Sequence, residues 1–485
     1  MIDLKGRREV CWDEELIESS EGVTVAQHKP IRKNIALVCD DVWEGVTCGY
    51  PSIMKIGDKY RLYYRASGQN EMAKGESFCV AESDDGKVFT KPMLGMYEYG
   101  EAKETNIFHM EERFIDNFTV HYDTNPACPA EERFKALSLV LPKEGFTPGV
   151  AYIPKLALYT SPDGLKFKYE RILPIKGVFD THNVLLWDEK NEIYRIYMRD
   201  FHNEDGSECT YEPTDAMNFC IRDVRLTTSK DLVEWTAPER IRFEEGTPDY
   251  QLYTNQIIKY PRADIYVGMP ARYRDRRDDK ANFKYLSDHG GWRRDLLAKG
   301  NRIGSAMTDC VLMFSRDGFN FKRDDNAFLA PAYEEGRNWY YGDCYVSHGI
   351  VETVSDENPN VTEYSFYTGE GYRQRAIEFV RYAIRLDGFY SWHAEHSGGK
   401  LLTKPIILGS TLSVNFRTSA LGGIRIVICD ENGIAIKGYD SGVLFGNSTA
   451  RSVDFAKPLS ELDGKAVKLR FELNDADIYS FCSEL

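Results

Sequence analysis

The chain has 485 residues, with 61 Lys and Arg against 76 Asp and Glu, which gives a formal net charge of −15. This acidic balance argues against a nucleic-acid partner or an anionic membrane surface, because both are bound through basic residues. No apolar run approaches the ~18–20 residues of a membrane span, and the N-terminal residues lack the apolar stretch of a signal peptide. The sequence thus predicts a cytoplasmic protein with no nucleic-acid and no membrane partner.

The 11 Cys are an odd number without paired spacing, which is typical of buried, reduced thiols. The sequence has no Cys-x-x-Cys or His-x-x-x-His pair, and its nine His are dispersed. We therefore expect neither a metal site nor a cofactor. The oligomeric state stays open, and a homo-oligomer is one of the states that the sequence allows.

A short pattern recurs along the chain: Ser, one spacer residue, Asp-Gly, and an aromatic residue three positions after the Gly. Asp-Gly favours a tight turn with positive φ, and the aromatic residue is suited to packing between sheets. Two copies are degenerate, the one at 229–235 because Leu replaces Gly and the one at 386–392 because Ser is lost. The Asp residues of the five copies stand at 85, 163, 231, 317 and 387. Five copies, each long enough for four strands, predict a five-bladed β-propeller.

The strands expected before each turn follow one order: an apolar strand, a strand rich in Tyr and Arg, and a third strand that ends at the turn. Helical periodicity is weak throughout, so the fold class is all-β. We assign residues 1–30 to an N-terminal lead-in strap, 31–396 to the propeller and 397–485 to a C-terminal β-sandwich of alternating short strands. In chain order the paired strands are expected at 50–56 and 60–65, 116–120 and 134–139, 180–187 and 194–199, 251–258 and 265–269, and 343–351 and 364–368.

The run from Pro51 to Tyr64 resembles the opening of glycoside hydrolase family 43, in which Asp-Pro-Ser precedes a strand, a turn and a Tyr-rich strand. The segment 179–187 is similar to the Arg-Asp-Pro strand of family 32. The resemblance implies a propeller glycosidase that cleaves a small saccharide or glycoside, such as a furanoside. The standard catalytic motifs are missing: Tyr50 stands where family 43 has its catalytic Asp, and 249–253 replaces the Glu-Cys of family 32. The chain therefore resembles an outlying group, for which fold does not carry reaction.

Acidic residues precede or begin each expected inner strand, namely Glu44, Asp116, Asp180, Asp249 and Asp343. Inner strands of a propeller converge on its axis, so we expect these side chains to meet in a funnel. Glycoside cleavage needs two carboxylates, about 5–5.5 Å apart for retention and about 6.5–9.5 Å apart for inversion. Crowded carboxylates raise at least one pKa, as a general acid requires. We predict Glu44, Asp180 and Asp343 as catalytic, without assigning acid and base.

The remaining candidates are polar or aromatic residues near the same strand ends. Arginines that follow aromatic strands can bind sugar hydroxyls or clamp the catalytic acids, and structural salt bridges between blades are the alternative. His182 lies two residues after Asp180 and therefore shares its strand face; a core histidine is the alternative. The predicted substrate-binding residues are Arg65, Asp116, Asn117, His182, Arg199, Asp249, Tyr253, Arg272, Trp339, Tyr340 and Glu370.

The function expected from this set is a glycoside hydrolase with a small carbohydrate substrate. One alternative is a phosphorylase or transglycosidase, which would need a basic phosphate subsite, and residues 272–277 offer the visible candidate. The other is a non-catalytic carbohydrate-binding propeller, which the replacement of Asp by Tyr50 favours.

Overall fold

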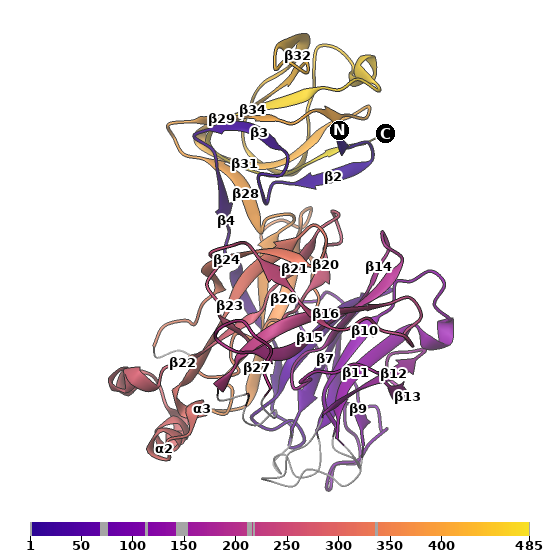
Figure 1. Ribbon diagram of the computed structural model, residues 1–485, viewed down its shortest axis with the longest axis vertical. Helices are drawn as coiled ribbons and strands as arrows, with labels where there is room; N and C mark the ends of the chain where they lie inside the picture. Colours follow the sequence, from indigo (N-terminus) through magenta and orange to yellow (C-terminus); the bar gives the residue numbers. More distant parts are fainter. Residues whose placement is uncertain are drawn as a thin grey trace.

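The computed structural model describes residues 2–67, 76–111, 115–141, 154–210, 216, 219–334 and 338–484. Regular structure in these residues is nearly all β, with two short α-helices. Figure 1 shows a larger lower part with the sheets of a propeller-like arrangement and a smaller upper part that holds both termini. Within the described ranges, no helix has the length and apolar character needed to cross a bilayer.

Four sheets have the four-stranded, antiparallel form of a propeller blade. The last of them takes its fourth strand, β5, from the N-terminal part of the chain, and β5 pairs with β27. In chain order the four sheets are β6 (Gly49–Ile56), β7 (Lys59–Ala66), β8 (Ser77–Ser83) and β9 (Ile107–Met110); β10 (Ile115–Tyr122), β11 (Phe134–Val140), β12 (Lys155–Ser161) and β13 (Lys168–Ile172); β14 (Val184–Asp188), β15 (Ile193–His202), β16 (Ile221–Ser229) and β17 (Glu239–Arg240); and β25 (Val351–Val354), β26 (Thr362–Glu370), β27 (Ile377–Arg385) and β5 (Ile31–Cys39).

The segment between the third and the last of these sheets forms an irregular seven-stranded sheet. Its second strand is interrupted at Pro270, which cannot donate a ladder hydrogen bond, so β21 and β22 pair separately with β23. Regular blades therefore number four rather than the five that the sequence predicts. The strands are β18 (Arg242–Phe243), β19 (Gln251–Leu252), β20 (Ile258–Lys259), β21 (Tyr266–Gly268), β22 (Ala271–Asp275), β23 (Ala306–Ser315) and β24 (Asn320–Leu329), with η2 (Arg277–Tyr285), η3 (His289–Gly291), α2 (Trp292–Ala298) and α3 (Arg302–Ser305) inserted after β22.

Hydrogen bonds join these five sheets into a closed ring. Each sheet contacts the next through a side chain that bonds to the neighbour's backbone or side chain, and the last sheet contacts the first. The donors and acceptors are Arg61 to the Asp163 carbonyl at 2.6 Å, Tyr194 to the Asp123 carboxylate at 2.9 Å, Tyr197 to the Gly318 carbonyl at 2.7 Å, Gln256 to the Val346 carbonyl at 2.5 Å, and Tyr60 to the Glu352 carbonyl at 2.8 Å.

The recurring Ser-x-Asp pattern forms the same turn after the third strand in four sheets. The Ser hydroxyl donates to the Asp carboxylate. It also accepts a hydrogen bond from the backbone N–H of the residue after the Asp, with N to O distances of 2.9–3.0 Å. That residue has positive φ, and Leu232 adopts it at 63° as the three Gly residues do. The fifth copy differs, because Asp387 itself takes φ 60° and β28 leaves the propeller there.

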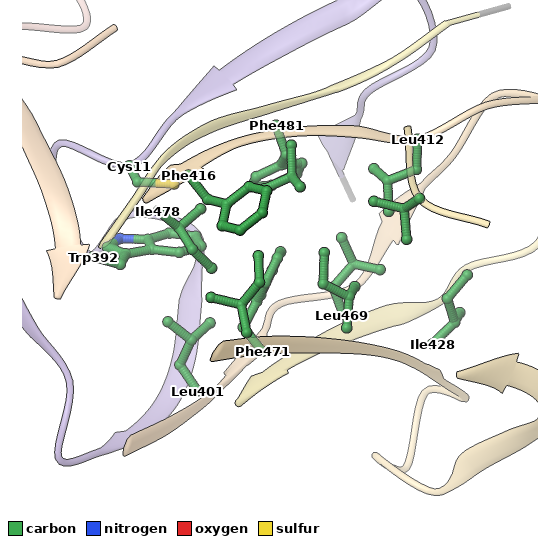
Figure 2. Close-up of a cluster of buried hydrophobic side chains, with 14 of the residues drawn as sticks. Cys11, Trp392, Leu401, Leu412, Phe416, Ile428, Leu469, Phe471, Ile478 and Phe481 are labelled. Carbon is green, nitrogen blue, oxygen red and sulfur yellow. The ribbon is translucent and has the colours of Figure 1, made fainter. Parts of the chain in front are cut away.

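The upper part is built on one nine-stranded sheet with a hydrophobic core that includes Trp392, Phe416, Phe471 and Phe481 (Figure 2). Residues expected to form a lead-in strap supply three of its strands. The strands are β2 (Arg7–Val10), β3 (Ile17–Glu21), β4 (Thr24–Gln27), β28 (Tyr390–Ala394), β29 (Gly399–Thr403), β31 (Ser413–Cys429), β32 (Ala435–Leu444), β33 (Asn447–Ser452) and β34 (Lys468–Ser483); β1 (Ile2–Asp3) pairs separately with β30 (Ile406–Ile407), and η1 (Ala130–Glu132) and η4 (Leu459–Leu462) are single turns.

The two parts are joined through β4 and β28, which pair with each other and flank the propeller sequence (Figure 1). Asp387 lies just before β28 and its carboxylate is fully buried. The carboxylate accepts hydrogen bonds from Tyr260 at 2.7 Å and Arg262 at 2.9 Å in the irregular sheet, and from Ser480 at 2.6 Å in β34. Asp387 is thus a shared acceptor at the junction.

Candidate active site at the propeller axis

Unusual backbone conformations mark the starts of the inner strands. Tyr50, Asn117, Gln256 and Cys344 have φ of 50°, 54°, 46° and 61°. The ladders of β6 and β10 shift register at Tyr50 and Asn117, and a bulge of this kind re-aims side chains. Polar and aromatic side chains at these strand starts and on the neighbouring strands contact one another in one group, which we call the axial cluster: Tyr50, Arg65, Glu76, Asp116, Asn117, Asp180, Arg199, Arg222, Tyr253, Tyr273, Tyr341 and Tyr345.

Arg65, at the end of β7, organises the acidic side of the axial cluster. Its Nη1 lies 3.2 Å from Glu76 and 3.4 Å from Asp116, and it donates to the Asn117 side chain at 3.2 Å. Burial raises the pKa of Glu76 well above its usual value; Arg65 opposes this shift, and the negative charges of Asp116 and Asp180 add to it. Glu76 Oε2 is buried and has no hydrogen-bond partner among the described residues. The burial of Glu76 thus favours its protonated form.

Asp180 connects this acidic side to a second arginine. Its carboxylate lies 3.0 Å from Arg199 Nη2 and accepts from the Asn117 amide at 3.4 Å. The Asp180 side chain is 32% exposed, whereas that of Arg199 is 2% exposed. Asp180 is therefore the carboxylate of the cluster that a ligand can reach most readily.

Tyrosines line the opposite side of the axial cluster. Tyr253 lies 5.5 Å from Tyr345 and 5.9 Å from Tyr273 between ring centroids, and its hydroxyl bonds to that of Tyr341. Tyr50 packs 5.6 Å from Tyr345 and carries the Arg65 guanidinium 4.7 Å above its ring. These rings form a buried aromatic packing surface beside polar groups, made of residue types that line sugar sites.

His182 lies beneath this surface, 5.3 Å from the Tyr50 ring, and its Nδ1 bonds to the Gln256 side chain. Burial and the neighbouring His348 lower the pKa of His182 to about 3, so its ring is neutral. The structure thus places His182 in the polar packing of the axis.

Glu44, which the sequence predicts as a catalytic residue, does not join the axial cluster. Its side chain is fully buried, accepts from Tyr64 at 2.6 Å and from the Asp41 backbone at 2.9 Å, and pairs with Lys91 at 2.7 Å. Asp40, Asp41 and Glu44 have the spacing of a metal site, but the Lys91 ammonium pairs with all three carboxylates. Glu44 is a loop acid that holds the chain before β6.

Asp343 and Glu370 are also committed to structural contacts rather than to the cluster. The Asp343 carboxylate is fully buried and accepts the backbone N–H groups of Tyr340 and Tyr372, both at 3.2 Å. It thereby positions Tyr341, which does enter the cluster. Glu370 pairs with both Arg32 nitrogens at 3.0 and 2.9 Å and fastens β5 to β26. Asp343, predicted as catalytic, and Glu370, predicted to bind substrate, therefore lie outside the axial cluster.

Arg272, Trp339 and Tyr340 point away from the axis. In β22 the inward residues are Ala271 and Tyr273, so Arg272 faces outward and pairs with Asp309 at 2.5 Å. Because Pro270 interrupts the strand, β22 is offset by one residue, and this offset turns Arg272 to the face opposite the axis. Trp339 donates to the Ala332 carbonyl, and Arg293 from the inserted helix α2 lies 4.3 Å above the Tyr340 ring.

Asp249 lies in a neighbouring cleft of about 600 Å³ between β16–β17 and β18–β19. It bonds to His202 Nε2 at 2.6 Å, and Asp223 bonds to Nδ1 at 3.0 Å. Burial opposes protonation of His202, but the two carboxylates raise its pKa to about 9. Arg222 borders both this cleft and the axial cluster.

The residues predicted from the sequence do not include Glu76 and Arg222. Both lie at the start of a third strand, where β8 and β16 return to the axis beside Arg65 and Arg199. A polar residue just before an apolar third strand is the signal that could have found them. Tyr341 lies in the aromatic run at 339–341 and Tyr345 follows it by four residues, but the predicted site residues include neither.

No protein-family model matches the sequence, and no curated protein matches it. Solved structures of similar overall course include an N-acetylgalactosamine deacetylase from F. plautii in complex with blood group B trisaccharide, at 10% identity and TM-score 0.45 over 75% of this chain and 96% of that chain. A second is a family 32 β-fructofuranosidase from Bombyx mori, at 9% identity and TM-score 0.39 over 94% of both chains. A third is a β-xylosidase, at 10% identity and TM-score 0.39 over 73% of this chain and 94% of that chain. At these values the function has to be inferred from the axial cluster itself.

Proposed function

We propose that the chain is a glycosidase that cleaves a small saccharide at the axial cluster, with Glu76 as proton donor and Asp180 as the second catalytic carboxyl group. The observation that carries the proposal is the pairing of two carboxyl groups in opposite environments. Glu76 is buried with a raised pKa, whereas Asp180 is partly exposed and ion-paired with Arg199. Such a division between neighbouring carboxyl groups assigns acid and base roles.

Glu76 suits the role of general acid. Its protonated carboxyl would transfer a proton to the glycosidic oxygen as the bond from that oxygen to the anomeric carbon breaks. The resulting alcohol leaves, and the Glu76 carboxylate is then stabilised by Arg65, 3.2 Å away. General acid catalysis of this kind contributes about 10²–10⁴ in rate.

Asp180 suits stabilisation of the positive charge that develops on the sugar ring. It has the largest exposure among the carboxylates of the cluster, and Asn117 and Arg199 fix its orientation. The tyrosine side of the cluster supplies the apolar surface for the ring. Direct attack by Asp180 gives retention and attack by an activated water gives inversion, so the anomer of the first product distinguishes the two.

The leaving group provides the test of Glu76. After a screen of aryl furanosides and pyranosides, with and without phosphate, has found a substrate, Glu76→Gln is compared on phenyl and dinitrophenyl glycosides. We expect kcat/KM to fall by about 10²–10⁴ for the phenyl glycoside and far less for the dinitrophenyl glycoside, which departs without a proton. Asp180→Asn should slow both.

Glu370→Gln is the matched control, since Glu370 is an equally buried, Arg-paired glutamate outside the cluster. It should lower Tm and leave kcat/KM unchanged. An equal loss on both leaving groups in Glu76→Gln would refute its role as proton donor. Sugar binding without turnover of any glycoside would favour the binding module.

Three of the four arginines in the basic candidate at 272–277 pair with an aspartate, namely Arg272, Arg276 and Arg277, so this segment gives the phosphorylase alternative less support. We further propose that the irregular sheet is the fifth blade of the propeller, since it occupies the ring between the third and last regular sheets. The nine-stranded sheet is proposed to be a β-sandwich that braces the propeller, and the protein to be cytoplasmic.

A further inference from the structure

The guanidinium groups of Arg199 and Arg222 are two cations that lie buried beside the same tyrosine ring. They are 2% and 1% exposed, and their guanidinium groups lie 4.9 and 5.2 Å from the centre of the same Tyr253 ring. They come from the paired strands β15 and β16. Two like charges on one ring repel each other unless anions compensate them.

The described residues supply an anion to only one of the two. Arg199 pairs with Asp180 at 3.0 Å. Arg222 bonds through Nη1 to the neutral side-chain oxygen of Gln251 at 2.6 Å, and no carboxylate of the described residues lies within ion-pair distance of it. Burial lowers the pKa of Arg222, and the charges of Arg199 and Arg302 lower it further.

Three acids of the adjoining cleft are already engaged. Asp249 is taken by His202 at 2.6 Å, Asp223 by His202 and Arg225 at 3.0 and 3.1 Å, and Glu208 by Arg225 at 2.7 Å. None of them neutralises Arg222, although that side chain borders their cleft.

Donor groups of both arginines are also without acceptors. Arg222 Nε and Nη2 and Arg199 Nε and Nη1 are buried and have no hydrogen-bond partner among the described residues. A guanidinium presents such N–H groups as a planar fork that matches an oxyanion with two oxygens. Buried donors of this kind are ordinarily satisfied.

We propose that Arg199 and Arg222 form a subsite for an oxyanion substituent of the sugar, so that the substrate is an acidic saccharide bearing a carboxylate or a sulfate. Arg222 supplies the uncompensated charge, Tyr253 the platform, and Asp180 remains beside the ring that reacts. This inference rests on the proposed function for its saccharide but not for its test, which measures binding alone.

The experiment compares the binding of three matched sets of methyl glycosides to the full chain by calorimetry: neutral hexosides, the corresponding uronides and the corresponding 6-sulfates. We expect one acidic set to bind at least about tenfold more tightly than its neutral counterpart, as a charge-assisted bidentate contact provides. The acidic set that binds identifies the oxyanion. Arg222→Gln should abolish the preference.

Arg293→Gln is the control, because Arg293 is also 2% exposed and stacked on a tyrosine but lies outside the axial cluster. It should keep the preference. Arg222→Lys retains the charge without the fork and should weaken the binding of the acidic sugar by about tenfold, which keeps the test valid if Arg222→Gln fails to fold.

Equal binding of neutral and acidic sugars, absence of binding by all three sets, or a preference that survives in Arg222→Gln and Arg222→Lys would each overturn the subsite. Binding of the acidic sugar through Arg222 without its cleavage would retain the subsite and overturn the proposed hydrolase.

Discussion

Asp387→Asn tests how the two parts of the molecule are held together. The Asp387 carboxylate is fully buried and receives hydrogen bonds from Arg262 at 2.9 Å, Tyr260 at 2.7 Å and Ser480 at 2.6 Å, while Arg8 lies 3.3 Å away. An amide has one acceptor oxygen instead of two and turns an N–H group toward these donors. Two arginines thereby lose their shared counter-charge.

The expected loss follows from the burial of this charge network. Removing one partner of a buried ion pair costs about 3–5 kcal/mol. Unfolding entropy of about 2.1 cal/mol/K per residue gives about 1 kcal/mol/K for the 485-residue chain. If the chain unfolds as one unit, Tm should therefore fall by about 3–5 °C, and a larger loss of contact between the parts should split the transition in two.

Scanning calorimetry and urea denaturation measure both effects. Burial raises the pKa of Asp387, but Arg262, Arg8 and Ser480 outweigh it, so the folded-state pKa lies below 3.8. The stabilisation is therefore present above pH 3.8 and is lost as the pH falls through the lower, folded-state value. Asp463→Asn, which removes an exposed acid paired with Lys5, should leave Tm unchanged. An unchanged Tm in Asp387→Asn at neutral pH would refute the reasoning.

Three further outcomes are expected. With a substrate in hand, kcat/KM should fall as the pH rises through the raised pKa of Glu76, and this limb should be absent from the pH profile of Glu76→Gln. The pKa of His202 is raised to about 9, so its stabilisation is present below pH 6.5 and lost as the pH approaches 9; urea titrations should show a fall of about 1–3 kcal/mol that His202→Gln lacks. Gly318→Ala should lower the free energy of unfolding by about 1–3 kcal/mol, because a Cβ at this position, where φ is 77°, would lie 2.7 Å from the Tyr197 hydroxyl. Gly442 also has a positive φ but no atom of the described residues within contact distance of a Cβ, so Gly442→Ala should cost less. Equal urea midpoints for the two variants would contradict this prediction.

Much of the fold could be predicted from the sequence because the repeated turn carries its own chemistry. The Ser hydroxyl and Asp carboxylate satisfy backbone groups locally, so the turn forms in the first four copies of the pattern, even with Leu232 in the Gly position. The irregular sheet could not be predicted in this way, because Pro270 divides one strand into two. Residues 7–27 pair with strands near the C-terminus, and no local sequence pattern predicts such long-range pairing.

The candidate site was predicted in part for a similar reason. Asp116, Asp180 and Arg199 lie where strand order and alternation predict them. Glu44 and Asp343 have the same local pattern, but their carboxylates are taken by a lysine, a tyrosine hydroxyl and backbone N–H groups. Which acid is satisfied by its own loop and which remains free for a ligand depends on packing between segments far apart in the chain.

Pairing of β5 with β27 has a consequence for biosynthesis. Arg32 meets its partner Glu370 across a separation of 338 positions, so at about 5–20 residues per second the ribosome needs roughly 20–70 s to deliver the second after the first. During that interval the nascent ring stays open at one seam and its earliest strand has no neighbour. Chains cut short before residue 377 should consequently be substrates for chaperones and proteases. The ring of sheets closes only when β27, which is made late, pairs with β5, which is made early.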